Sequence, residues 1–443
     1  MTDTAFKEKG DAFWSWLEQN GATLSDGIEF KDYSNENAGR GVVATKDFKE
    51  GDILFSIPRK LLLSEYTSKL RKLDAMDENL DSMAGWNPLI LSMMYENRAD
   101  SFWKPYLDIL PRTFSTPIFW NKEDLKELEG TDVPAKIGKP EAEDMFKEEI
   151  ASVIKGHPEL FDENIHTLDL FHICGSLVMA YSFHDERGVK DKGYELDSDD
   201  EELEEELGKD LIAMVPMADM LNHKTGFNNA RLFHEADRLE MKAIISIAKG
   251  DQIYNTYGEL CNADLLRKYG FIDENNPFDI CELDEDLVMS ICANKDDDDQ
   301  LREKKIDFLM GEGILEDCFV LDNDYQIPPE LIITAHVLKS SKDEINIMIE
   351  KDKLPKPNLT PEIKDLILKV LEKRLARYPT SLEDDLVALE ADDLRLNKRN
   401  ALQVRIGEKQ VLLETLKNLK NMTPRTASKR SAEKDERPAK HRK

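Results

Sequence analysis

The residues best suited to chemistry lie in three short segments. AGRG occupies residues 38–41, VPMADMLNH ends in Asn222 and His223, and IYNTYG with the following LLRKYGF contains Tyr257 and Tyr269. A tyrosine offers an apolar ring face and one hydroxyl, so tyrosines suit the wall of a narrow site that orients a polar group. Taken alone, Asn222 fits a turn residue equally well, His223 a hydrogen-bonded core histidine, and the tyrosines aromatic residues of a sheet core.

Two β regions must position these segments. AGRGVVATKDFKEGDILFSIP alternates β-branched and turn residues, which predicts two short strands joined through Lys49-Glu50-Gly51-Asp52. LEMKAIISIAKGDQIYNTYG repeats the order of strand, KGD turn and strand much later in the chain. The echo is too short to indicate a repeat fold, and the preference of KGD for turns would explain it equally well.

The apolar spacing is helical between the β regions, in NPLILSMMYENR, EDMFKEEIASVIKG and TLDLFHICGSLVMAYSF, and again after Glu282. Thr360 and Pro361 predict an N-cap and a first helical residue. An apolar face follows (Ile363, Leu366, Ile367, Val370, Leu371, Leu375), and ALQVRIGEKQVLLETLKNL predicts another amphipathic helix. We therefore expect an α+β fold: a mainly-β domain at 1–282 with a helical insert at about 65–190, an all-α domain at 283–422, and a disordered basic tail at 423–443.

The composition is that of a soluble globular protein. Of 443 residues 40% are hydrophobic and 34% charged, and no apolar stretch approaches the length of a membrane span. The amino end carries both charge signs and does not resemble a targeting peptide, so cytosol or nucleus is the default location. The five cysteines (Cys174, Cys261, Cys281, Cys292, Cys318) form no CxxC pair, so we expect buried thiols and no metal.

The net charge of −30 would repel nucleic acid and steer a cationic partner towards the protein. The charge is uneven: nine acids lie in Glu195–Glu206, and the 19 residues from Arg425 hold eight Lys or Arg against three acids. The acid run fits a solvated surface loop and could also help to attract a basic protein.

Several common catalytic motifs are absent. The chain contains no GxxxxGK[ST], HExxH or GxSxG, which excludes the usual anchors of P-loop, zincin and α/β-hydrolase chemistry. Gly39-Arg40-Gly41 lacks the third glycine of a dinucleotide fingerprint and precedes a predicted strand. The histidines show no metal-ligand spacing.

The order of seven segments resembles that of the split-SET protein lysine methyltransferases, in which a helical insert divides the catalytic domain. The segments are AGRG, SFWKPYLDILP, HPELF, VMAYSF, MVPMADMLNH, NTYG and ALQVRIGEKQ. The resemblance spans roughly residues 10–420 and extends to the subgroup of SET domain-containing protein six and fungal ribosomal lysine methyltransferase four. It implies a SET fold, S-adenosylmethionine as cofactor and methyl transfer to a protein lysine. The cysteine-rich zinc site of histone methyltransferases is missing, and the helical carboxyl-terminal domain is expected in its place.

The resemblance also implies roles for single residues. Tyr257 would be catalytic, beside the transferred methyl. The donor pocket would involve Ala38, Gly39, Arg40, Tyr181, Asn222, His223 and Tyr257, with His223 as a pocket residue and not a general base. The substrate side would involve Trp103, Phe183, Asp219 and Tyr269, although a core tryptophan fits Trp103 almost equally well. The Rubisco enzyme has Arg at the position of Tyr181, so one hydroxyl contact is expected where a bidentate contact would stand.

The expected chemistry places demands on the aromatic channel. Methyl transfer from a sulfonium to an amine is an in-line displacement, which requires a neutral lysine. A free lysine with a pKa of about 10.4 is charged at neutral pH. Desolvation in an aromatic channel and a nearby sulfonium both lower that pKa.

We expect the substrate to be a basic protein, with a large-subunit ribosomal protein favoured. A histone or a transcription-related protein is the alternative substrate, and a non-catalytic SET-fold binding protein is the alternative function. Lys429-Arg430 and the later Lys440-His441-Arg442-Lys443 resemble a bipartite nuclear localisation signal, which predicts the nucleus and leaves the cytoplasm open. We expect no direct nucleic-acid or membrane partner, and the sequence does not indicate an oligomeric state.

Overall fold

The computed structural model describes residues 3–36, 38–185 and 211–423. The acid run at Glu195–Glu206 and the basic tail after Thr423 lie outside the described residues. The chain is α+β and divides into two compact units. Unit 1 comprises Met1–Leu128, Val133–Phe278 and Asp393–Val404, and unit 2 comprises Glu129–Asp132, Asp279–Asp392 and Arg405–Lys443.

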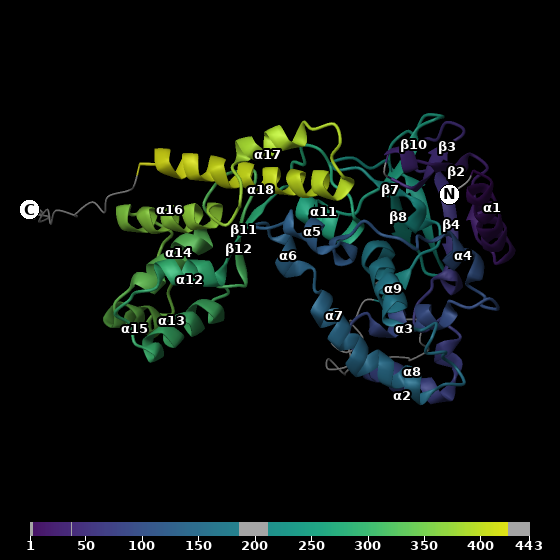
Figure 1. Ribbon diagram of the computed structural model, residues 1–443, viewed down its shortest axis with the longest axis horizontal. Coiled ribbons are helices and arrows are strands. Elements are labelled where there is room, and N and C mark those ends of the chain that lie inside the picture. The colour runs from purple at the N-terminus through teal and green to yellow at the C-terminus, as the bar shows by residue number, and fades with distance from the viewer. Residues whose placement is uncertain (1–2, 37, 186–210, 424–443) are drawn as a thin grey trace, which may run out of the picture. The chain divides into compact units, whose positions relative to one another are not determined.

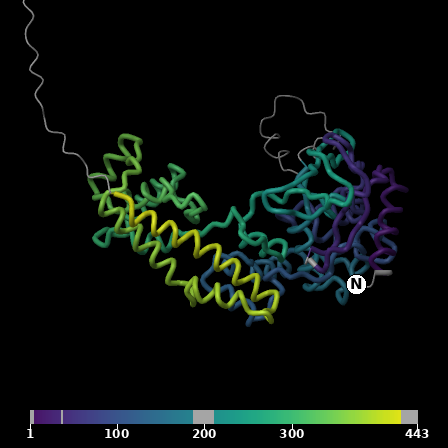
Figure 2. Tube along the Cα trace, turned by 90° about the horizontal axis from the view of Figure 1, so that it is seen from above, coloured from purple at the N-terminus to yellow at the C-terminus, as the bar shows by residue number. Residues whose placement is uncertain are grey.

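Unit 1 contains two four-stranded sheets and a two-stranded ribbon (Figure 1). The first sheet has the order β1 (Thr23–Leu24), β4 (Ile53–Pro58), β9 (Arg238–Ala243) and β8 (Ala230–His234). The second has the order β2 (Ile28–Asp32), β3 (Arg40–Ala44), β10 (Gln252–Asn255) and β7 (Asn222–His223). The ribbon pairs β5 (Ser182–Asp185) with β6 (Leu211–Met214). Each sheet therefore pairs strands from an early segment, residues 23–58, with strands from a late segment, residues 222–255. The two segments lie side by side in Figure 2.

The two similar turns of unit 1 each link one sheet to the other. The turn after β3 leads to β4 and the turn after β9 leads to β10, while β3 pairs with β10 in one sheet and β4 with β9 in the other. The connections also pair with each other: Phe48 and Ile247 exchange backbone hydrogen bonds of 2.8 and 3.0 Å. Gly51 and Gly250 adopt φ values of 89° and 96°, a region that favours glycine, and this explains the glycine in each copy.

Unit 1 also contains helices, which come before, between and after these strands along the chain. They are α1 (Asp3–Gln19), α2 (Asp77–Ser82), α3 (Asn87–Glu96), α4 (Lys104–Ile109), α5 (Lys122–Lys126), α6 (Val133–Lys136), α7 (Lys139–Met145), α8 (Ala151–Gly156), α9 (Leu168–Tyr181) and α11 (Asn262–Tyr269). A π-helical turn at Phe146–Ile150 separates α7 from α8. Thr167 caps α9 by accepting from Leu170 N, and the buried face of α9 packs on α3. The predicted helical insert is thus present as a series of short helices.

Unit 2 is helical apart from one ribbon (Figure 1). Its helices are α12 (Glu285–Cys292), α13 (Asp299–Gly311), α14 (Pro329–Lys339), α15 (Lys342–Glu350), α16 (Pro361–Leu375), α17 (Leu382–Leu389) and the part of α18 (Leu396–Asn421) from Arg405 onwards. The predicted cap is confirmed: Thr360 accepts from Ile363 N at the start of α16. The expectation of an all-α domain requires correction, because β11 (Cys281–Asp284) pairs with β12 (Cys318–Leu321). Their alternating burial is the period of a strand, in segments too short to have been predicted.

One arginine organises the centre of unit 2. Arg374 is 1% exposed, and its guanidinium donates to Gly130 O (2.7 Å), Asp132 Oδ1 (2.7 Å), Glu282 O (2.9 Å) and Glu408 Oε2 (3.2 Å). Burial lowers the pKa of Arg374, but the acidic groups around it outweigh burial and hold that pKa above its ordinary value. The segment 129–132 therefore belongs to unit 2 through a buried charged cluster, although its neighbours in sequence belong to unit 1.

Four of the five cysteines are buried thiols as expected, and Cys318 is only partly buried. Among the described residues, no group of three histidine, cysteine or acidic side chains could hold a metal ion. In the same part of the chain, no helix has both the length and the apolar character needed to cross a membrane.

Candidate active site

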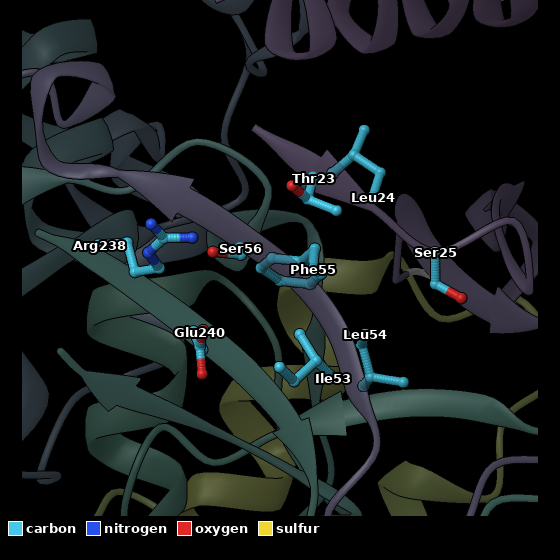
Figure 3. A pocket seen from close by; sticks show the side chains of 9 residues that line it. All are labelled: Thr23, Leu24, Ser25, Ile53, Leu54, Phe55, Ser56, Arg238 and Glu240. Atoms are coloured by element: carbon cyan, nitrogen blue, oxygen red, sulfur yellow. The ribbon is translucent and has the colours of Figure 1, made fainter. Parts of the chain in front are cut away.

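A hollow of about 290 Å³ lies along β1, β4 and β9, but it contains none of the predicted site residues (Figure 3). Its lining includes Thr23, Ser25, Ile53 and Glu240, with Arg238, whose guanidinium is paired with Asp237. No aromatic pair or buried titratable group converges there, so we place the site elsewhere in unit 1.

Strand register brings the polar pair and the tyrosine segment together. β7 pairs with β10 in parallel, so that Asn222 lies opposite Tyr254 and His223 opposite Asn255. The next residues of the β10 chain lead to Tyr257, whose backbone N donates to His223 Nδ1 at 3.1 Å. Asn222 Nδ2 in turn donates to Gln252 Oε1 at 3.0 Å. These hydrogen bonds hold the Asn222-His223 segment against the segment that leads to Tyr257.

Both ring nitrogens of His223 lie near hydrogen-bond partners. Because Nδ1 accepts from Tyr257 N, the proton lies on Nε2, which is 3.4 Å from Thr225 Oγ1. Burial lowers the pKa of His223 despite the nearby Asp273, so the ring is neutral at pH 7. With its lone pair occupied, His223 acts as a structural acceptor that fixes the backbone at Tyr257.

Aromatic rings stack beside this backbone. The ring centroids of His223 and Tyr257 are 5.0 Å apart, and those of Tyr257 and Tyr269 are 4.5 Å apart with nearly parallel planes. Phe271 lies near both His223 and Tyr269. Tyr257 Oη donates to Leu221 O at 3.0 Å, and burial, with Tyr181, Tyr269 and Asp219 nearby, holds the pKa of Tyr257 well above its ordinary value. Its hydroxyl is therefore neutral and retains lone pairs for an N–H donor.

A buried carboxyl belongs to the same group of residues. Asp219 lies in a 3-10 turn at Ala218–Met220, and its Oδ2 accepts from Tyr106 Oη at 2.5 Å. Burial raises the pKa of Asp219 to about 8, although hydrogen bonds from Tyr106 and the backbone oppose the shift. Burial raises the pKa of Tyr181, the last residue of α9, to about 12, and Asp219 contributes to that shift. Met217, just before this turn, is buried with a φ of 80°, a strained conformation of the kind found at functional sites.

The AGRG loop approaches Asn222 through its second glycine. A Cβ on Gly41 would lie 2.8 Å from Asn222 Nδ2 and 2.9 Å from the Tyr33 ring, so only glycine fits there. Ala38 and Gly39 are exposed and close the loop by backbone hydrogen bonds with Tyr33. The Arg40 guanidinium stacks on Phe6, 3.5 Å from the ring centroid, and burial lowers the pKa of Arg40 to about 10.

The AGRG loop gives the clearest sign of a fit to the cofactor. Gly41 brings the main chain so close to Asn222 that a Cβ would fill the space, which suits a loop that lies along a bound ligand. The Arg40 guanidinium points to α1, where it packs on Phe6 and Phe30 and donates to Phe6 O. The small loop residues and the aromatic stack fit S-adenosylmethionine and a lysine side chain.

The structure brings several of the predicted residues together. The contacts above join Asn222, His223, Tyr257 and Tyr269, and the charge of Asp219 helps to raise the pKa of Tyr181 and Tyr257. Phe183 lies on β5, paired with Ala213. Trp103 is 2% exposed and packs on Trp16 and Phe102; its predicted place beside the substrate groove stays a prediction.

Sequence reasoning missed three residues that support the site. Tyr106 lies in the same SFWKPYLDILP segment as Trp103, and its ring stacks on Phe13. Gln252 and Tyr33 hold Asn222 and the AGRG loop. Only Tyr106 had a signal, namely its place in a segment already noted for the family resemblance.

Comparison with known proteins decides the family. A SET-domain family model matches residues 39–258, and a model described as Rubisco LSMT substrate-binding matches residues 296–412. The N-lysine methyltransferase setd6 of Danio rerio is 33% identical, with 90% of this chain and 93% of the relative covered. The chain belongs to the SET-domain protein lysine methyltransferases. Ribosomal lysine N-methyltransferase 4 of Saccharomyces cerevisiae is 32% identical over 75% of this chain and 72% of its own.

Solved structures agree with this SET-domain methyltransferase fold. The SET domain of LSMT bound to lysine and AdoHcy aligns with a TM-score of 0.69 at 23% identity, covering 94% of this chain and 91% of that one. The protein is a protein-lysine N-methyltransferase, and S-adenosylmethionine is its methyl donor. This assignment excludes the non-catalytic binding protein kept as an alternative above.

The contact between Gly41 and Asn222 gives a testable expectation. Gly41→Ala places a methyl group into the Asn222 amide and the Tyr33 ring, so Asn222 must move away from Gln252. We expect the dissociation constant of S-adenosylmethionine to rise about tenfold, equivalent to the loss of one good hydrogen bond. Titration calorimetry measures this. Gly51→Ala, which lies away from Asn222 and whose added Cβ meets no atom, should leave donor affinity unchanged.

Proposed function

We propose that this methyltransferase acts on a lysine of a basic protein, with a large-subunit ribosomal protein as the favoured substrate. Tyr257 is proposed as the catalytic residue, Tyr269, Phe183 and Asp219 as residues of the lysine site, and Trp103 as a residue beside the peptide groove. Ala38, Gly39, Arg40, Tyr181, Asn222 and His223 are proposed to hold the donor. The observation that carries the site is the stack of His223, Tyr257 and Tyr269 beside the buried carboxyl of Asp219.

The proposed roles follow from the chemistry of the transfer. When bound, S-adenosylmethionine supplies a methyl group on a cationic sulfonium. The stacked tyrosines desolvate the incoming ammonium, which lowers its pKa and favours the neutral amine. Tyr257 then orients that amine: its proton is held by Leu221 O, so its oxygen can accept an N–H without becoming ionised. His223 keeps Tyr257 in place, because it anchors the backbone nitrogen of the same residue.

Two features support a basic protein substrate. The net charge of −30 favours encounter with a cationic partner. The Saccharomyces relative is named for ribosomal lysines, and this supports the ribosomal choice. A histone or transcription-related protein is the second candidate, favoured by the similarity to setd6, whose name specifies no ribosomal target. We propose a nuclear location from the basic carboxyl-terminal residues, and ribosomal proteins and histones both pass through that compartment.

Transfer of radiolabelled methyl from S-adenosylmethionine tests the substrate. Purified protein is incubated with unmodified large-subunit ribosomal proteins and, separately, with core histones, and the products are resolved by electrophoresis. A single labelled ribosomal band would support the proposal and identify the protein to map. Label in histones alone would replace the ribosomal assignment with the second candidate.

A further inference from the structure

The first two residues of β3 face different neighbours. Side chains alternate between the two faces of a strand, so Arg40 and Gly41 point to opposite sides. Gly41 lies against Asn222, where a Cβ would be 2.8 Å from the amide nitrogen. The Arg40 guanidinium lies on α1, with Cζ 3.5 Å from the ring centroid of Phe6, and its Nη2 donates to Phe6 O at 3.2 Å. The start of β3 therefore connects α1 with Asn222.

The sequence of α1 leaves room for this guanidinium. Gly10 lies one turn after Phe6, and a Cβ there would be 3.3 Å from Arg40 Nη1 and 3.3 Å from the Phe30 ring. Inside a helix glycine is less favourable than alanine, so the space that Arg40 needs explains a glycine in the middle of α1. Phe30, on β2, provides a second ring, 5.3 Å from Arg40 Cζ. The guanidinium thus packs on two aromatic rings and on the helix backbone.

Arg40 is cationic in this position. Burial lowers the pKa of Arg40 to about 10, and the opposite charge of Asp32, its partner in the sheet register, opposes that shift, so the side chain is charged at pH 7. A partly desolvated cation on the face of an aromatic ring is a stabilising contact. Phe13 holds α1 separately, because it is fully buried and its ring stacks on Tyr106. Loss of the Arg40 contact would therefore release the loop from α1 without releasing the helix.

We propose that Arg40 is a positioning residue for the methyl donor, whose side chain fastens the 38–41 loop to the first turns of α1 and so keeps Gly41 against Asn222. This inference rests on the proposed function, because it takes the 38–41 loop and Asn222 as parts of the donor site. Phe6 then contributes to donor affinity from the opposite face of β3. Without this contact the loop spends less time in the binding arrangement, and the apparent affinity falls by the same factor.

Titration calorimetry of the full chain with S-adenosylmethionine tests this role in a double-mutant cycle. Arg40→Met keeps a long side chain and removes the cation, whereas Phe6→Leu keeps an apolar side chain and removes the ring. We expect each variant to raise the dissociation constant about fivefold, the effect of losing a partly buried cation–π contact. The double variant should bind no more weakly than Arg40→Met, because both changes remove the same contact. Phe6→Tyr keeps the ring and should bind like the wild type.

Arg98→Met is the matched control for Arg40→Met. Arg98 also stacks on an aromatic ring of unit 1, with Cζ 3.9 Å from the ring centroid of Tyr95, but it follows α3 in the helical part of that unit. We expect Arg98→Met to leave the affinity for S-adenosylmethionine unchanged. Thermal unfolding of each variant without donor measures any general loss of stability separately from the loss of affinity.

Other results would overturn the inference. An effect of Arg40→Met without an effect of Phe6→Leu would assign the guanidinium to the donor itself. Effects that multiply in the double variant would indicate two independent roles, and unchanged affinity in both single variants would reduce the contact to packing. A loss of affinity in Arg98→Met as large as that in Arg40→Met would trace the effect to general stability. Gly41→Ala tests the proposed function separately, because unchanged donor affinity in that variant would remove the 38–41 loop from the donor site.

Discussion

Tyr257→Phe is expected to lower the rate of methyl transfer by about a hundredfold, the size of effect that follows from losing the alignment of a reacting group. The variant keeps the ring that stacks on His223 and Tyr269 but loses the oxygen that orients the amine. Because the donor pocket is otherwise intact, the dissociation constant of S-adenosylmethionine should stay within about threefold of the wild-type value, or about 0.7 kcal/mol. Single-turnover transfer and calorimetry separate the two quantities.

Tyr254→Phe is the matched control for this variant. Tyr254 lies three residues earlier on β10, where its ring packs on Phe227 and not on the tyrosine stack. The control should transfer methyl at close to the wild-type rate. Transfer by Tyr257→Phe at a similar rate would remove the Tyr257 hydroxyl from the mechanism, whatever its effect on donor binding.

Arg374→Leu is expected to destabilise unit 2 by about 3–5 kcal/mol, because it leaves buried acids without their counter-charge. The substitution removes the donors to Asp132, Glu408 and two backbone carbonyls at once. Burial raises the pKa of Glu408 to about 8 even with Arg374 present, so loss of the cation would favour its protonated form further. Part of the cost is thereby relieved at low pH, and the destabilisation should be larger at pH 9 than at pH 6.

The positions of the tryptophans allow this effect to be located. All five tryptophans lie at or before Trp120 and therefore belong to unit 1, whereas helices of both units contribute to the circular dichroism signal. We expect Arg374→Leu to shift the part of the helical signal that comes from unit 2 to lower urea, while the tryptophan fluorescence midpoint stays in place. Arg377→Leu is the control, because its partner Asp284 and Arg377 itself are both about 40% exposed and the pair contributes at most about 1 kcal/mol. Equal effects of the two variants would contradict a special role for Arg374.

Local signals in the sequence were sufficient for several elements. Thr360 and Pro361 define the start of α16 by cap chemistry that acts within one turn, and the apolar spacing before Tyr181 identifies α9. The SET family could also be predicted, since several motifs in a fixed order are far more specific than any one of them. The comparisons confirm that resemblance.

Contacts between distant segments could not be predicted in this way. Asp132 meets Glu408 across 276 residues, and no periodicity records such a pairing. Within SFWKPYLDILP, the resemblance pointed to Trp103 beside the groove, with a core tryptophan almost as suitable, because the direction of each side chain depends on a six-residue helix and its neighbours. The structure turns Trp103 into the core and Tyr106 towards Asp219.

The close stack of Tyr257 and Tyr269 has a consequence for the timing of catalysis. Carbon atoms in contact are about 3.5–4.0 Å apart, so two rings that hold an alkyl chain between them need a separation of about 7 Å. At 4.5 Å the pair leaves no room for a lysine between the rings. A lysine that enters between them must therefore displace Tyr269, at the end of α11, and the methylated product must displace it again to leave. Such a gate would exclude water between turnovers and would make entry or release, and not the methyl transfer itself, the slow step.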